Sequence, residues 1–159
     1  MPSRYIFLEK AEKHYLSANH LLNTTLPAIK DPKLLLGVIE NIFLCLESSI
    51  DALLSHESEL LLITPPPKNF EGKLAVFQTR TAPRNKIDSS FVDLAVTMKE
   101  LVELHKKTPM EFRRNDSFVL TSKDYRLKNL TVPLITQHLA KTKEFLENTK
   151  RIIEKYRKY

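Results

Sequence analysis

The spacing of apolar residues near the start of the chain predicts an amphipathic helix from about Ser3 to Thr24. These positions recur at intervals of four, three, four and three residues, which places them on one face of a helix. Pro27 is expected to mark its end, because proline inside a helix removes a hydrogen bond and crowds the preceding turn. The residues of the stripe are Phe7, Ala11, His14, Ala18 and Leu21.

The segment from about Pro32 to His56 is predicted to be the most apolar helix of the chain. Asp31 offers a capping side chain, and Pro32 suits the first helical position. Leucine, isoleucine, valine and phenylalanine cover more than one face of this helix. It must therefore be covered on several sides, either by its own bundle or by a second subunit. Three prolines at 65–67 are expected to begin a stiff, extended connection.

Two more helices are expected between the prolines at 65–67 and Pro109. The first is short and runs from Asn69 to about Thr81, where Pro83 is expected to break it. The second is capped by Asp88 and closed within a few residues by Pro109.

Residues 110–131 show a different pattern, with alternating or β-favouring side chains on both sides of Lys123 and Asp124. The final helix is expected to begin near Thr131 or Pro133, and its inward positions alternate at intervals of four and three residues. The whole pattern predicts an all-α protein. We expect an antiparallel bundle of four to five helices, with a small β-hairpin or extended insertion near 117–131. No repeat or long linker divides the chain, so 1–159 is predicted to be a single helical domain.

Charge is distributed unevenly along the 159 residues, whose formal net charge is +6. Residues 1–64 carry 5 Lys/Arg against 8 Asp/Glu, whereas residues 65–159 carry 20 against 11. A basic half suits a nucleic acid or another polyanion, although lysine-rich solvated helix faces give the same count. The chain has no apolar stretch of about 18 residues and no signal-peptide pattern. We therefore expect a cytoplasmic protein that does not enter a membrane.

The sequence lacks the residues that several kinds of functional site require. Cys45 is the single cysteine and lies in an apolar run, so we expect it to be buried. No two histidines are three or four residues apart, and the spacing of His56 and Glu59 is a weak metal signal, so we predict no metal and no cofactor. Two glycines are too few for a glycine-rich phosphate loop. Three histidines fall on inward stripes, where a hydrogen-bonded interior role is typical: His14, His105 and His138.

The densest polar cluster extends from His105 to Arg126. Counting His105, it holds seven basic residues against three acidic ones, interleaved with phenylalanine and tyrosine. Basic groups pair with phosphates and aromatic rings stack on unpaired bases, so this composition suits single-stranded RNA. Alternatively, Arg113 and Arg114 pair with neighbouring acids and fix the loop. The predicted ligand-binding residues are Lys106, Lys107, Arg113, Arg114, Asn115, Tyr125 and Arg126.

The layout resembles the HEPN domains, a helical-bundle family named for nucleotide binding in higher eukaryotes and prokaryotes. The resemblance rests on the opening helix at 11–18, the apolar helix at 40–54 and the lysine-rich closing helix at 139–155. It covers most of the chain and fits least well over 65–131. Membership implies a helical bundle that commonly forms dimers. Where an arginine is followed by a histidine after four to six intervening residues, it also implies a metal-independent ribonuclease.

That diagnostic pair is missing from this sequence. No histidine has an arginine at the required distance before it, and none stands at that distance after the Arg-Asn dipeptides at Arg84 and Arg114. We therefore predict a non-catalytic HEPN-like module that forms a homodimer and binds RNA or a nucleotide through its basic loop.

Two alternatives to this function remain open. In the first alternative, the protein is the helical partner of a nucleotidyltransferase in a two-gene module of the toxin–antitoxin kind. In the second, it is a divergent metal-independent ribonuclease. In the second case, the candidate catalytic residues are His105, Arg113 and Arg114.

Overall fold

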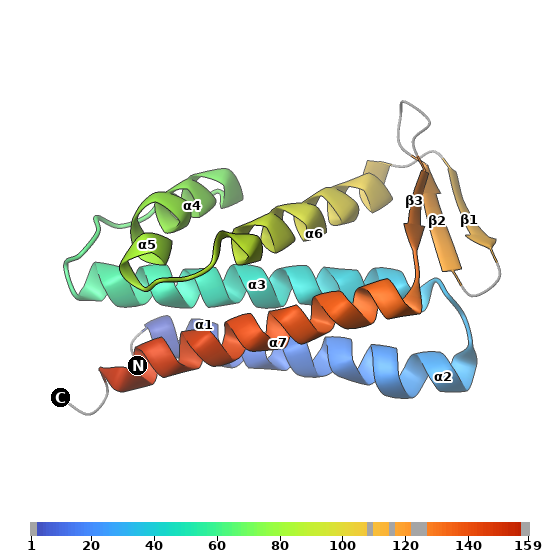
Figure 1. Cartoon of the computed structure of the whole chain (residues 1–159), viewed down its shortest axis with the longest axis horizontal. Helices are drawn as coiled ribbons and strands as arrows, with labels where there is room; N and C mark the ends of the chain where they lie inside the picture. Colours follow the sequence, from blue (N-terminus) through green and yellow to red (C-terminus); the bar gives the residue numbers. More distant parts are fainter. Residues whose placement is uncertain (1–2, 108–109, 115–116, 122–126, 157–159) are drawn as a thin grey trace.

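The computed structural model shows a bundle of long helices with a small antiparallel sheet at one end (Figure 1). The structure describes residues 3–107, 110–114, 117–121 and 127–156. It confirms the predicted helical bundle with a small β insertion. The insertion begins earlier than expected, at Met110, and contains three strands. Among the described residues, none of the helices combines the length and the apolar character that a membrane span requires.

The first helix continues past its predicted end. α1 (Ser3–His20) leads through a π-helical turn, η1 (Leu21–Thr25), into α2 (Leu26–Ile29), so Pro27 lies inside a continuous helix. The first amide after the turn donates to a carbonyl five residues earlier. This wider turn accommodates the proline ring, which would crowd the carbonyl of an ordinary α-turn. The prediction that Pro27 ends the helix was therefore wrong.

The same arrangement occurs a second time. α4 (Phe70–Val76) passes through the π-helical turn η2 (Phe77–Thr81) into α5 (Ala82–Arg84), which contains Pro83. Again the first amide after the turn donates to a carbonyl five residues earlier. Pro83 is thus absorbed into the helix rather than breaking it.

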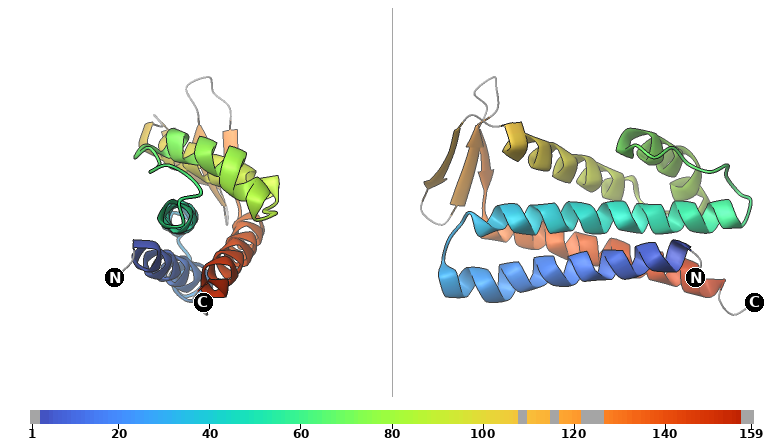
Figure 2. Two further views of the ribbon diagram at one scale, coloured as in Figure 1. Left: turned by 90° about the vertical axis from the view of Figure 1, so that its left-hand side faces the viewer. Right: turned by 180° about the vertical axis from the view of Figure 1, so that it is seen from behind.

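α3 (Leu34–Glu59) is the central helix of the bundle. It packs against α1, against α6 (Ser89–Lys107) and against α7 (Val132–Lys155). Viewed along the bundle, α1 and α7 lie on one side of α3, and α4, α5 and α6 lie on the other (Figure 2). Apolar side chains on several faces of α3 are consequently buried by the chain itself. The apolar character of this helix does not require a second subunit.

The predicted cap at Asp88 is confirmed, and Thr131, near which the last helix was expected to begin, is a second cap. The Asp88 carboxylate accepts a hydrogen bond from the amide of Ser90 at 2.9 Å, at the start of α6. The Thr131 hydroxyl accepts one from the amide of Leu134 at 3.3 Å, at the start of α7. Each cap satisfies an amide that has no partner within its helix.

Aromatic side chains join η2 and α6 to α7. The ring of Phe145 on α7 lies 5.9 Å from that of Phe77 in η2 and 5.2 Å from that of Phe91 on α6. All three rings are buried in the core. Their contact fixes η2 and the start of α6 onto α7.

The sheet has the strand order β1–β2–β3, with each neighbouring pair antiparallel. Its strands are β1 (Met110–Arg114), β2 (Ser117–Thr121) and β3 (Leu127–Leu130). Val119 and Leu130 are buried, which anchors the sheet at the end of the bundle. β1 is an edge strand that pairs with β2 alone.

Candidate functional site

The sheet end of the bundle carries part of the predicted basic cluster. Lys106 is exposed in the last turn of α6, and Lys107 is the final residue of that helix. His105 is half-buried in the same turn and already engaged in an interaction. Positive side chains at a helix C-terminus are favoured by the helix dipole.

Arg113 and Arg114 lie at the other end of β1. The strand begins at Met110, just after α6, and four residues of extended chain span ~13 Å. The sequence cluster is thus divided between the two ends of the strand. Asn115, Tyr125 and Arg126 lie outside the described residues.

The candidate catalytic combination gains no support from this backbone arrangement. His105 lies in the last turn of α6, whereas Arg113 and Arg114 are at the far end of the following strand. The register pairs Arg113 with Phe118 and Arg114 with Ser117. A basic position and an aromatic position are therefore neighbours across the two strands.

The opposite end of the bundle holds a buried carboxylate that sequence reasoning missed. Glu57, near the end of α3, is only 2 % exposed. Its carboxylate accepts hydrogen bonds from the Thr81 hydroxyl at 2.7 Å, the Arg84 guanidinium at 2.6 Å and the Asn85 amide at 3.2 Å. Both residues of the Arg84–Asn85 dipeptide thus hold η2 and α5 onto α3. Saturated in this way, the carboxylate is suited to a structural role rather than to acid–base catalysis.

A second polar cluster surrounds His56, which is 2 % exposed. Its Nδ1 lies 3.1 Å from Nη1 of Arg4, and its ring packs edge-on against that of Tyr156. Burial lowers the pKa of His56, and the Arg4 charge lowers it further. Arg4 also pairs with Glu59 at 3.3 Å. The Arg4 guanidinium therefore lies beside both His56 and Glu59, the pair whose spacing was a weak metal signal. The described residues contain no group of three or more His, Cys, Asp or Glu side chains that could hold a metal ion.

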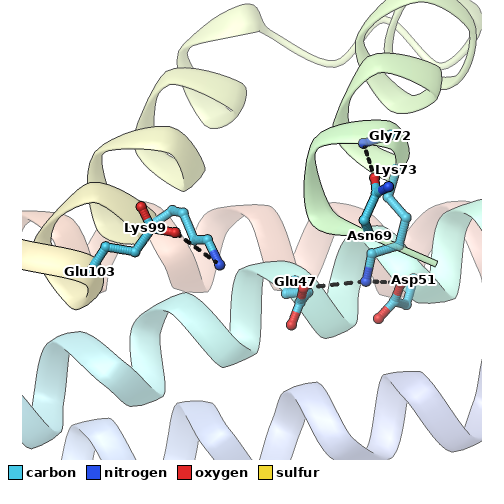
Figure 3. Close-up of polar contacts among 7 residues, drawn as sticks. All are labelled: Glu47, Asp51, Asn69, Gly72, Lys73, Lys99 and Glu103. Atoms are coloured by element: carbon cyan, nitrogen blue, oxygen red, sulfur yellow. Dashed lines mark hydrogen bonds and ion pairs between the residues drawn. The ribbon is translucent and has the colours of Figure 1, made fainter. Parts of the chain in front are cut away.

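An ion-pair cluster fastens α4 to the middle of α3 (Figure 3). Nζ of Lys73 lies 3.2 Å from the Glu47 carboxylate and 3.0 Å from the Asp51 carboxylate. Burial raises the pKa of Asp51, although the hydrogen bond and charge of Lys73 oppose the shift. Burial also lowers the pKa of Lys73, but its two carboxylate partners outweigh burial and raise it overall. A lysine held as a cation in this way is a poor nucleophile, so the cluster is suited to packing rather than covalent chemistry.

The cap of α4 supports the same cluster. Oδ1 of Asn69 accepts a hydrogen bond from the amide of Gly72 at 2.6 Å, immediately before Lys73 (Figure 3). Lys99 on α6 lies nearby, 5.3 Å from the ring centre of Phe43 and 5.5 Å from that of Phe70. These contacts fix both helices over the same stretch of α3.

The remaining candidate nucleophile and bases have interior roles. Burial raises the pKa of the Cys45 thiol to about 12, so the thiolate does not form at neutral pH. His14 hydrogen-bonds Asn41 at 3.1 Å, as expected for a bundle-lining histidine. Burial lowers the pKa of His138, with a further contribution from Lys141.

Comparisons with known proteins identify no relative. The sequence matches no family model, no curated protein and no solved structure.

Proposed function

We propose that the protein is a non-catalytic, HEPN-like module that binds RNA or a nucleotide through the basic residues of its sheet end. The observation that supports this most is the strand register, which pairs Arg113 with Phe118 on adjacent strands. A sheet that presents basic and aromatic positions side by side suits the binding of single-stranded RNA. Cations contact its phosphates, and rings stack on its bases.

Charge along the same segment supports the proposal. Lys106 is exposed at the end of α6, and Arg113 and Arg114 lie on an edge strand. Arg113 and Arg114 are consecutive positions at the far end of β1, and four residues of extended chain, ~13 Å, separate them from the start of the strand that follows α6. The basic positions therefore extend along the strand rather than gather at one point, which suits a polyanion more than a single phosphate.

The proposal is tested by the salt dependence of binding to a mixed-sequence single-stranded RNA, measured by fluorescence anisotropy. Each phosphate contact contributes roughly 0.7 to the slope of log affinity against log salt, so R113A/R114A should flatten the slope by about one unit or more. The matched control is K10A/K143A, which removes the same charge from exposed positions on α1 and α7. Equal slopes in both variants would exclude the sheet end as the RNA site.

Self-association is part of the proposal, and its contact surface must lie elsewhere than on α3. The described apolar residues most open to solvent include Leu61, which is 89 % exposed, with Leu60 and Leu62 exposed beside it. Leu61 and Leu62 border a groove of about 760 Å³ that α4 and η2 also line. The segment 60–62 is therefore the surface we expect at a homodimer contact.

The same exposed leucines would equally serve the alternative, contact with a protein partner such as a nucleotidyltransferase. Light scattering at micromolar concentration distinguishes the two. A mass of two chains that falls to one chain in L61S/L62S supports the homodimer. A mass of one chain at all concentrations rejects the homodimer and favours the protein partner.

A further inference from the structure

A groove of about 430 Å³ lies between the turn that follows α5 and the last three turns of α7. Its volume is within the range of small-molecule sites. Apolar and basic side chains line it together: Ile87, Phe91 and Ile152 on the one hand, and Lys86, Arg151 and Lys155 on the other.

The three cations of this groove form no ion pair in the part of the chain that the structure describes. Nearby basic residues differ in this respect. Arg84 is held by Glu57 at 2.6 Å, and Lys150 lies 2.7 Å from the Glu12 carboxylate. The cations of the groove are also exposed, so their charge is open to a ligand.

Neighbouring polar groups modify this positive potential. The guanidinium of Arg151 donates a hydrogen bond to the side-chain oxygen of Asn148, which also lines the groove. Two carboxylates are present as well, those of Asp88 and Glu144. The first is committed to the amide of Ser90 as the cap of α6, and that hydrogen bond lowers its pKa. The positive end of the α6 dipole lies at the same place.

We propose that this groove binds a small phosphate monoester that carries a flat or apolar body. Lys86, Arg151 and Lys155 would contact the phosphate, since lysine supplies a point charge and arginine a two-pronged donor. The apolar wall formed by Ile87, Phe91 and Ile152 would hold the body of the ligand. Inorganic phosphate would leave the apolar wall exposed to water, and the flat or apolar group alone would leave the three cations without an anion. Each part alone should therefore bind more weakly than the whole ligand.

This site stands apart from the proposed RNA surface. The groove lies at the N-terminal end of α6, and the sheet follows its C-terminal end, ~27 Å away along a 19-residue helix. That separation exceeds the Debye length of ~8 Å at physiological salt, so the exposed charges of the two sites are screened from each other.

The test uses adenosine 5′-monophosphate, adenosine and inorganic phosphate as separate probes in isothermal titration calorimetry at pH 7.5. We expect saturable binding of the monophosphate, with adenosine and inorganic phosphate each at least tenfold weaker. The variant K86Q/R151Q should weaken binding of the monophosphate at least tenfold. Its match is K10Q/K143Q, which removes the same charge from exposed lysines of α1 and α7 outside the groove and should stay within twofold.

Three results would overturn the proposal. They are no saturable binding of the monophosphate, equal affinity for monophosphate and inorganic phosphate, and equal weakening in K86Q/R151Q and K10Q/K143Q. The R113A/R114A protein separates this test from that of RNA binding. It should bind the monophosphate like the parent protein, and a tenfold loss there would also count against the groove. Thermal melting of each variant checks that these exposed substitutions leave the fold intact.

Discussion

Arg84 and Glu57 form a 2.6 Å ion pair that joins the end of α5 to the last turns of α3. The carboxylate is 2 % exposed, while the arginine side chain is 36 % exposed and reaches the solvent. If Arg84 were removed, the Glu57 carboxylate would stay buried and would keep its desolvation penalty without the charge that offsets it.

Removing this arginine should therefore destabilise the fold. We expect R84A to lower the free energy of unfolding by about 2 kcal/mol, since Thr81 and Asn85 still donate to the carboxylate. The control is R80A, an exposed arginine of η2 for which about 0–0.5 kcal/mol is expected. Urea unfolding monitored by circular dichroism measures both, and equal losses would show that the ion pair contributes nothing specific.

His56 should make stability depend on pH. Its pKa is lowered in the folded protein by burial and by Arg4, so the unfolded chain, with a histidine pKa of about 6.5, takes up the proton first. This contribution to stability is fully present above about pH 6.5 and is lost as the pH falls below that value. The free energy of unfolding should drop between pH 7.5 and pH 5, and H56Q should reduce the drop.

Two other groups bear on this pH experiment. His138 has a lowered pKa as well, so part of the drop should remain in H56Q. Asp51 has a raised pKa and acts in the opposite sense at lower pH, and it does so equally in both proteins. If the parent and H56Q lose the same stability over this range, His56 is not the responsible group.

Leu61 occupies a position that glycine would fill better. Its φ is 60°, and its amide and that of Leu62 donate to the carbonyls of Ser58 and Glu57, which is the Schellman arrangement at the end of α3. The left-handed conformation costs roughly 1–2 kcal/mol for a residue with a Cβ. Because the side chain is 89 % exposed in the single chain, L61G should stabilise the monomer by about 1 kcal/mol, and the measurement is made at a concentration at which the protein is monomeric.

The neighbouring residue provides the matched comparison for this substitution. Leu60 has a φ of −84°, so L60G gains no relief of strain and should destabilise by about 0.5–1 kcal/mol. Melting temperatures that move in the same direction for both variants would contradict the argument from backbone conformation.

The two glycines should respond oppositely to alanine. A Cβ on Gly72 would lie 2.6 Å from Oδ1 of Asn69 and 2.7 Å from Cβ of Pro67, so G72A must disrupt the cap of α4. The expected loss is about 1 kcal/mol. On Gly37, the added Cβ meets only the end of the Leu21 side chain at 3.3 Å, so helix propensity should make G37A neutral or stabilising by up to about 1 kcal/mol. Thermal melting of both variants measures the contrast, and a stabilising G72A would refute it.

Cys45 should be unreactive until the protein unfolds. Its thiol is buried and its pKa is about 12, so almost no thiolate exists at pH 8. Ellman's reagent should release no measurable product from the native protein within an hour and one equivalent in 6 M guanidinium. Rapid reaction of the native protein would mean that the middle of α3 opens to solvent.

Apolar periodicity was sufficient to predict the long helices, because each buries one stripe in a shared core. The cap at Asp88 and the start of the last helix near Thr131 could also be predicted, since a cap is a local relation between a side chain and an amide two or three residues away. Pro27 and Pro83 were misjudged as ends. The π-turn that accommodates each proline depends on how the whole helix packs, and no local pattern marks it.

The polar contacts at the two ends of the bundle were harder to foresee. Glu57 finds its partners 24 to 28 residues later in the chain, at Thr81, Arg84 and Asn85, so nothing near it in the sequence announces its burial. Composition alone found the basic segment 105–126. It did not show that a strand separates the lysines at the end of α6 from Arg113 and Arg114.

Arg4 and Tyr156 both contact His56, so the first turn of α1 and the last turn of α7 lie together, at the end of the bundle away from the sheet (Figure 1). Attachment to a sensor chip near either of these residues would therefore hold the molecule upright. The sheet would project into the flowing solution at the far end of α3, which is ~39 Å long. RNA passing over the chip would reach the basic strands unhindered, whereas the groove beside Lys155 would lie close to the support and is better assayed with the protein free in solution.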